Sequence, residues 1–258
     1  MILIGERVNT GFKKIKQAVL DKDPKPLQEM AKMQAKAGAT YLDVNLGAVS
    51  SDAAIMCWMI DAVQDVVDTP ISIDCNKVDI VAKAIKVCKK PPIINSTTAV
   101  PEKLDPLMAI AVEYNAGING LAIDESGNPH NMEKRLETAG KILAQAMELG
   151  LPTDHVYLDP ILMPLKFSQE QIPNILEGIR QFRMMDDPAP NVICGLSNIS
   201  NQAEHKKLIN RIFLSMAIAN GLTAAICDVL DPDLINAVRC AEFLMNREIY
   251  ADSFVVVE

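Results

Sequence analysis

The chain has 258 residues, is 49% hydrophobic and carries a formal net charge of −8. This acidic balance argues against nucleic acid or an anionic membrane as the main partner, and an aromatic content of 4% leaves few rings for stacking on bases. No apolar run approaches the roughly 20 residues that a membrane span requires, and the start has no basic signal-peptide region, so we expect a cytoplasmic protein.

Short apolar runs alternate with amphipathic segments along the chain. The predicted strands span 2–8, 40–46, 71–75, 92–96, 120–123, 156–162, 192–196 and 224–229. The predicted helices span 25–37, 53–67, 78–88, 103–114, 133–149, 171–182, 206–219 and 234–244. This alternation favours a parallel sheet with helical crossovers, and a (β/α)8 barrel commonly needs about 250 residues. We predict one α/β TIM-barrel domain over residues 1–258, with an open doubly wound sheet as the alternative.

Six of the apolar runs lead to a carboxylate or a carboxamide. These polar residues are Glu6, Asp43, Asn45, Asp74, Asn95, Asp159 and Asn198. Barrel enzymes build their active sites at the carboxyl ends of the strands. Taken alone, each residue is equally well explained as the cap of the following helix, but the whole set favours a ligand-binding site. A ring without His, Cys or Lys predicts a neutral, hydrogen-bonding pocket for a polar heterocycle, rather than a phosphate, metal or Schiff-base site.

A pterin fits such a ring. Its pyrimidine side offers an amino group and a ring N–H as donors, beside ring nitrogens and a carbonyl as acceptors. Asp74 and Asp159 can accept hydrogen bonds from such donors, and Asn95 can donate and accept together. Asn198 is either a turn residue or a neutral donor toward a nitrogen whose bond is breaking. Glu6 and Asp43 are either structural carboxylates or supports of the site.

Other chemistries are disfavoured by what the sequence lacks. The three His, at positions 130, 155 and 205, have no metal-ligand spacing. There is no G-x-S-x-G elbow, G-x-G-x-x-G loop or P-loop, and no predicted strand contains a Lys. Lys206 and Lys207 begin a predicted helix, as solvated charges or as attractors of an anionic tail or partner.

Seven motifs spread over the chain resemble one known family. They are Ile-Gly-Glu-Arg-Val-Asn at 4–9, Leu-Asp-Val-Asn-Leu-Gly at 42–47, Ile-Asn-Ser-Thr at 94–97, Tyr-Leu-Asp-Pro at 157–160, Gly-Leu-Ser-Asn-Ile-Ser at 195–200, Leu-Ile-Asn-Arg at 208–211 and Tyr-Ala-Asp-Ser-Phe-Val at 250–255. The chain resembles the methyltetrahydrofolate:corrinoid methyltransferases of the pterin-binding barrel family, including those of corrinoid-dependent demethylase systems. It is more distantly similar to the folate module of methionine synthase and to dihydropteroate synthase.

The resemblance implies a pterin-binding TIM barrel, usually a homodimer, that moves a methyl group between 5-methyltetrahydrofolate and the cobalt of a corrinoid (cobalamin). A separate corrinoid protein or corrinoid iron–sulfur protein carries this corrinoid. The implied pterin and folate site comprises Asp74, Asn95, Asp159, Gly195, Ser197 and Asn198. Asp74 and Asn198 are the implied catalytic residues, and no metal is implied. Glu6, Asp43, Asn45 and Lys206 are expected to support the site or contact the partner.

One departure and two rival functions accompany this resemblance. Lys206 stands where the acetogen enzymes have an Arg, and the two residues are not equivalent at a bidentate contact. The first rival, dihydropteroate synthase, needs basic residues on the last two strands, which the sequence around 224–231 lacks. The second rival is a non-catalytic folate-binding protein.

Overall fold

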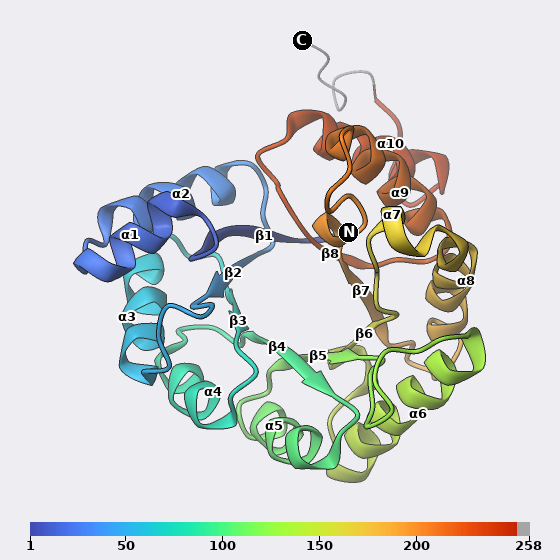
Figure 1. Ribbon diagram of the computed structural model, residues 1–258, viewed down its shortest axis with the longest axis horizontal. Coiled ribbons are helices and arrows are strands. Elements are labelled where there is room, and N and C mark those ends of the chain that lie inside the picture. The colour runs from blue at the N-terminus through green and yellow to red at the C-terminus, as the bar shows by residue number, and fades with distance from the viewer. Residues whose placement is uncertain (252–258) are drawn as a thin grey trace.

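The computed structural model describes residues 1–251 as a closed barrel of parallel strands enclosed by helices (Figure 1). The strands follow one another around the barrel in chain order, and the first pairs with the last. They are β1 (Ile2–Asn9), β2 (Tyr41–Asn45), β3 (Ile71–Asp74), β4 (Ile93–Thr98), β5 (Gly117–Leu121), β6 (Val156–Asp159), β7 (Asn191–Gly195) and β8 (Ala224–Cys227). The predicted barrel is confirmed, and the open-sheet alternative is wrong.

The helices pack their apolar faces on the outside of the sheet. The main ones are α2 (Lys25–Lys36), α3 (Ala53–Gln64), α4 (Val78–Ala84), α5 (Pro101–Glu113), α6 (Met132–Leu149), α8 (Ile172–Phe182), α9 (Lys206–Ala219) and α10 (Pro232–Leu244). Local chemistry sets their ends: the Asn131 side chain accepts a hydrogen bond from the Lys134 N–H at 2.8 Å, and Gly150 ends α6 at φ 79°. Within residues 1–251, no helix has the length and apolar character to cross a membrane.

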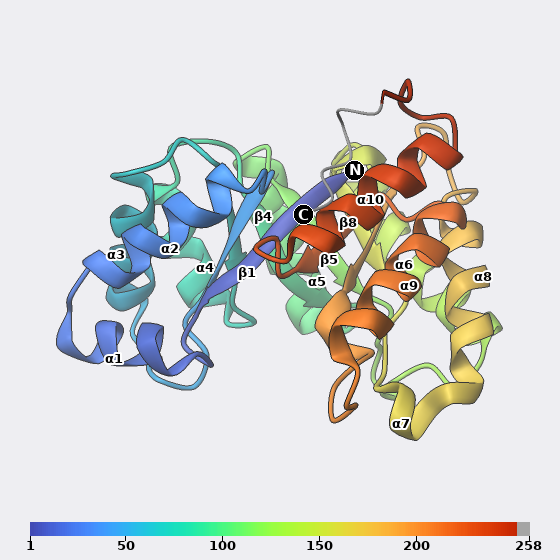
Figure 2. The same cartoon turned by 90° about the horizontal axis from the view of Figure 1, so that it is seen from above.

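Two helices were not predicted. α1 (Lys13–Asp21) follows β1 directly, and α7 (Leu165–Ser168) interrupts the connection from β6 to α8. Ile15, Ala18 and Val19 of α1 are buried at helical spacing, so its signal is present in the sequence. Both helices lie toward the end of the molecule to which β1 runs, away from the N-terminus (Figure 2). They therefore border the carboxyl end of the barrel.

β5 begins three residues earlier than predicted, at Gly117 instead of Gly120. Both glycines are required by close packing, because a Cβ on Gly117 would lie 2.9 Å from the Tyr157 ring and one on Gly120 would lie 2.7 Å from Ile142. Glycine normally weakens a strand prediction, which explains the misplaced boundary. Part of the motif at 250–255 lies outside the described residues, because these end at residue 251.

The barrel interior is divided between an apolar amino end and a polar carboxyl end. A small cluster of Ile4, Ile93, Tyr157, Ile193 and Ala224 fills the amino end and is separate from the main core beneath the helices. We call this cluster the plug. Alternate residues of a strand face the same side. Three plug residues, Ile4, Ile93 and Tyr157, are each followed two positions later by a polar residue that faces the same interior. These polar residues are Glu6, Asn95 and Asp159.

Candidate functional site

A chain of hydrogen bonds crosses four neighbouring strands in the polar half of the barrel. Asp43 Oδ1 accepts from Ser72 Oγ at 2.7 Å and from Asn95 Nδ2 at 3.1 Å. Asn95 Oδ1 in turn accepts from Asn119 Nδ2 at 2.9 Å. The four side chains are buried and come from β2, β3, β4 and β5. Buried polar groups of this kind hold one another in fixed orientations.

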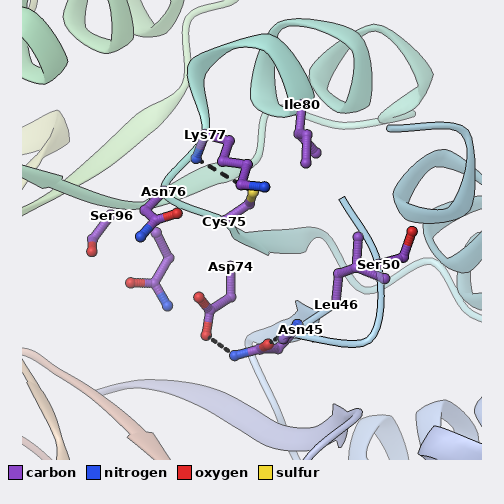
Figure 3. Close-up of a pocket in the computed structure, with 11 residues that line it drawn as sticks. Asn45, Leu46, Ser50, Asp74, Cys75, Asn76, Lys77, Ile80 and Ser96 are labelled. Carbon is purple, nitrogen blue, oxygen red and sulfur yellow. Dashed lines mark hydrogen bonds between the residues drawn. The ribbon is translucent and has the colours of Figure 1, made fainter. Parts of the chain in front are cut away.

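The carboxyl group of Asp74 lies next to that of Asp43 in this chain. Asp74 accepts a hydrogen bond from the Asn45 carboxamide, and the two side chains face each other at the strand ends (Figure 3). Burial raises the pKa of Asp43, and the neighbouring charge of Asp74 raises it further. Burial also raises the pKa of Asp74. The pair therefore favours one shared proton over two adjacent negative charges.

A first cavity of about 340 Å³ opens beside this pair, which is within the size range of small-ligand sites. Asn45, Asp74 and Asn95 contribute its polar wall, and the loop after β3 contributes a second wall (Figure 3). Lys77 is the basic residue of that loop wall, and Ile80 supplies apolar surface. The cavity thus combines a carboxylate, the three carboxamides of Asn45, Asn76 and Asn95, and one cation.

Asp159 ends β6 and is held by the backbone that follows it. Its Oδ1 accepts the Ile161 N–H at 2.8 Å. Ile161 has φ 66°, which is unusual for a β-branched residue, so this turn stores backbone strain. Burial raises the pKa of Asp159 to about 7, although the backbone N–H groups of Ile161 and Gly195 oppose that shift. A carboxyl group with this pKa changes charge near neutral pH.

A second cavity of about 790 Å³ lies where β1, β7, β8 and α9 meet. Glu6, Ser197, Asn198 and Lys206 all line it. Ser197 Oγ donates to Glu6 Oε1 at 2.8 Å, which ties the residue before Asn198 to β1. Burial raises the pKa of Glu6 to about 7, and the Ser197 hydrogen bond opposes that shift.

Gly195 supports Asn198 by being small. A Cβ built on Gly195 would lie 3.0 Å from Asn198 Nδ2, a tight contact that would require the carboxamide to shift by a few tenths of an ångström. The missing side chain therefore leaves room for the carboxamide of Asn198 to lie close to the strand end. Gly195 itself lines neither the first nor the second cavity.

Cations also border the second cavity. Arg7 Nη1 lies 3.3 Å from Asp228 Oδ2, and its guanidinium carbon lies 4.2 Å from the centre of the Phe12 ring. Lys206 and Lys207 are exposed at the start of α9. Arg7 is thus paired within the barrel mouth, while the two lysines extend at its rim.

The structure divides the predicted site residues into three groups. Asn45, Asp74 and Asn95 line the first cavity, whereas Glu6, Ser197, Asn198 and Lys206 line the second. Asp43, Asp159 and Gly195 line neither cavity, and the first two are buried. Apart from Lys206, which begins α9, these residues lie on strands or directly after them. They therefore share the carboxyl end of the barrel, although they do not enclose one cavity.

Sequence reasoning missed several polar residues of this region. Ser72 stands inside an apolar run just before Asp74, which is a visible signal. Asn119 was hidden because the predicted strand began one residue after it. Lys77 lines the first cavity from a loop position that no single-sequence pattern singles out. Ser96 also lines it and belongs to the motif at 94–97, from which only Asn95 was predicted as a site residue.

The comparisons with known proteins agree on the family. A family model described as "Pterin binding enzyme" matches residues 5–228. The methylcorrinoid:tetrahydrofolate methyltransferase of Eubacterium limosum is 30% identical over 254 residues, which cover 96% of this chain and 92% of that protein. The methionine synthase of Mycobacterium leprae is 25% identical over 240 residues, which cover 88% of this chain and 20% of that longer protein.

Solved structures agree on the fold. A dihydropteroate synthase from Coxiella burnetii, solved in complex with pteroic acid, matches with a TM-score of 0.74 at 14% identity, covering 96% of this chain and 94% of that one. The Yersinia pestis enzyme matches with a TM-score of 0.71 at 11% identity, covering 96% and 94%. At such low identities the likeness concerns the barrel alone. The family match spans most of the sequence and agrees with the motifs, so the chain belongs to the pterin-binding enzyme family.

Proposed function

We propose that this protein is a methyltransferase that moves a methyl group between 5-methyltetrahydrofolate and the corrinoid of a separate corrinoid protein. The observation that carries this proposal is the end-to-end relationship to the methylcorrinoid:tetrahydrofolate methyltransferase, which covers 96% of this chain and 92% of that protein. The family match alone supports a pterin ligand but leaves its reaction open.

The polar half of the barrel suits the pterin ring. Asp74 and Asp159 supply acceptors for the amino and ring N–H groups, and Asn95 supplies a donor and an acceptor that its partners leave available. Such groups contribute mainly by the penalty for leaving a buried partner unpaired. Because Asp159 titrates near pH 7, a pterin donor that binds it would hold the carboxylate in its ionised form.

The second cavity suits the reacting end of the folate. A tertiary amine is a poor leaving group until its nitrogen gains a proton or a hydrogen bond, and the corrinoid, when bound, supplies the cobalt(I) nucleophile. Asn198 is a neutral donor whose interaction with that nitrogen strengthens as its bond to the methyl group breaks. Glu6 fixes Ser197, and Gly195 leaves space for the carboxamide, so both position Asn198.

The end of β8 argues against pteroate synthesis. That reaction releases pyrophosphate and needs basic residues on the last two strands. β8 is followed by Asp228, which forms an ion pair with Arg7 at 3.3 Å. This pairing makes the charge of Arg7 less available to an anionic ligand. The exposed Lys206 and Lys207 lie beyond the strands, on α9. Methyl transfer therefore remains the better interpretation.

The decisive assay mixes the protein with 5-methyltetrahydrofolate and reduced free cobalamin and follows the visible absorbance of the corrinoid. We expect conversion to methylcobalamin, and the reverse reaction with tetrahydrofolate. A parallel assay for pteroate formation tests the synthase alternative. Tight folate binding without methyl transfer to the cobalamin would favour the carrier alternative.

The corrinoid partner and the assembly state are part of the same proposal. A titration against small corrinoid proteins and corrinoid iron–sulfur proteins, with transfer scored in both directions, identifies the partner. Light scattering tests the expected homodimer. Cell fractionation tests the expected cytoplasmic location.

A further inference from the structure

Asn119 is a buried carboxamide that the proposed reaction does not yet use. Its side chain is 1% exposed in the middle of β5. Its Nδ2 donates to Asn95 Oδ1 at 2.9 Å. Its own Oδ1 is buried and has no hydrogen-bond partner within residues 1–251. Among residues 1–251, the hydrogen bond to Asn95 is thus the one by which this carboxamide acts on a predicted site residue.

The hydrogen-bond chain that ends on Asn119 has a fixed direction. Asp43 Oδ1 already accepts from Ser72 and can only accept from Asn95. Asn95 must therefore direct Nδ2 toward Asp43 and Oδ1 toward Asn119. Asp43 can share a proton with Asp74 through its Oδ2 without changing this order, because Oδ1 then still accepts both hydrogen bonds. Asn119 completes the order by donating.

This direction decides what Asn95 offers to a ligand. Asn95 keeps one N–H and one lone pair of Oδ1 after its two partners are counted, and it lines the first cavity. A rotation of the carboxamide by half a turn would exchange the places of donor and acceptor. Without its hydrogen bond from Asn119, only one contact with Asp43 would oppose that rotation.

We propose that Asn119 is a positioning residue that fixes the carboxamide of Asn95, and so sets the donor and acceptor order that the first cavity presents to the pterin edge of folate. This inference rests on the proposed function, since it takes reduced folate as the ligand. It extends that function to a residue of β5, a strand from which the motifs name no site residue. Asn119 acts through Asn95, so it needs no contact with the folate itself.

Two variants separate positioning from simple packing. Asn119→Leu keeps the approximate size and removes the donor at every pH. Asn119→Asp keeps the shape, and its carboxyl donates to Asn95 Oδ1 only while it is protonated. Burial raises the pKa of such a carboxyl, so ionisation occurs above its usual range. An ionised carboxylate opposes Asn95 Oδ1 and favours the rotated carboxamide.

The experiment measures the Kd for 5-methyltetrahydrofolate by calorimetry from pH 5.5 to 8.5, with each variant compared with the wild type at the same pH. Thermal melts identify the pH range in which each variant is folded. We expect Asn119→Leu to bind about tenfold more weakly at every pH, as the loss of one buried hydrogen bond implies. We expect the loss in Asn119→Asp to be small at pH 5.5 and to grow as the pH rises.

Each outcome has one interpretation. An Asn119→Asp variant that stays near wild type throughout keeps its proton and still donates, which supports the positioning role if Asn119→Leu is impaired. A folded Asn119→Leu variant with wild-type affinity overturns that role, as do equal, pH-independent losses in both variants. A wild-type protein that does not bind 5-methyltetrahydrofolate contradicts the proposed function instead.

Discussion

The two ends of the barrel interior are built from the same strands but serve different purposes. At the amino end, Ile4, Ile93 and Tyr157 belong to the apolar plug. Two residues further along the same strands, Glu6, Asn95 and Asp159 carry polar groups. Burial stabilises the fold at the plug, whereas at the mouth it raises carboxyl pKa values toward neutrality. Residues two positions apart on one strand thus contribute to stability at the amino end and to the proposed site at the carboxyl end.

The plug should affect stability most. The side chain of Ile93 is 1% exposed, so Ile93→Ala leaves a buried cavity. We expect this variant to lower the free energy of unfolding, measured by urea titration, by about 2–5 kcal/mol. Leu244→Ala, at an 86% exposed site, is the control and should change it by less than about 0.5 kcal/mol. The folate Kd of the folded Ile93→Ala protein should stay within about threefold. A large Kd change would show that the two ends are not separable.

Asn198→Ala should affect the reaction most. We expect the rate of methyl transfer to fall about 10²-fold or more, because a donor that acts on the transition state is lost, while the folate Kd changes less than about threefold. Asn201→Ala, which also lies on the second cavity, is the matched control. Single-turnover kinetics and calorimetry measure the two quantities. Equal losses in rate and affinity would refute the proposed role.

Asp159 should make folate binding depend on pH. Burial raises the pKa of Asp159 to about 7, so below pH 7 a folate that binds the carboxylate must displace a proton. The folate affinity should therefore rise by up to about tenfold per pH unit as the pH approaches 7, and then level off. Asp159→Asn should flatten this profile, and Asp159→Ala should raise the Kd at least about tenfold at pH 8.

Glu6 provides the control for this profile because its pKa is also about 7. Glu6→Gln should keep the pH dependence of folate affinity that belongs to Asp159. If calorimetry shows the slope lost in Glu6→Gln and retained in Asp159→Asn, the titrating residue has been misassigned.

Gly195→Ala should have the smallest effect. The added methyl group would lie 3.0 Å from Asn198 Nδ2 and should displace that carboxamide, lowering the methyl-transfer rate about three- to tenfold without unfolding the protein. Gly140→Ala is the control, because its nearest contact would be an ordinary 3.7 Å to Met185. Steady-state assays and thermal melts compare the two. Equal rates in both variants would show that Asn198 does not depend on the glycine.

Sequence periodicity predicted the barrel because buried parallel strands and amphipathic helices have different repeats. It also found most polar strand ends, since a carboxylate after an apolar run is conspicuous. It could not find Asn119, because glycines on both sides concealed the strand and because its role depends on Asn95 of the neighbouring strand. Pairing between strands and the division of the mouth into two cavities are tertiary properties that no local pattern contains.

The central claim is that the polar half of the barrel binds reduced folate and directs its methyl-bearing nitrogen toward Asn198. A crystal structure with 5-methyltetrahydrofolate tests it most directly. We expect the pterin ring among Asp74, Asn95 and Asp159, with the methyl-bearing nitrogen within hydrogen-bonding distance of the Asn198 carboxamide. A ring bound away from these side chains, or a methyl group directed away from Asn198, would contradict the account.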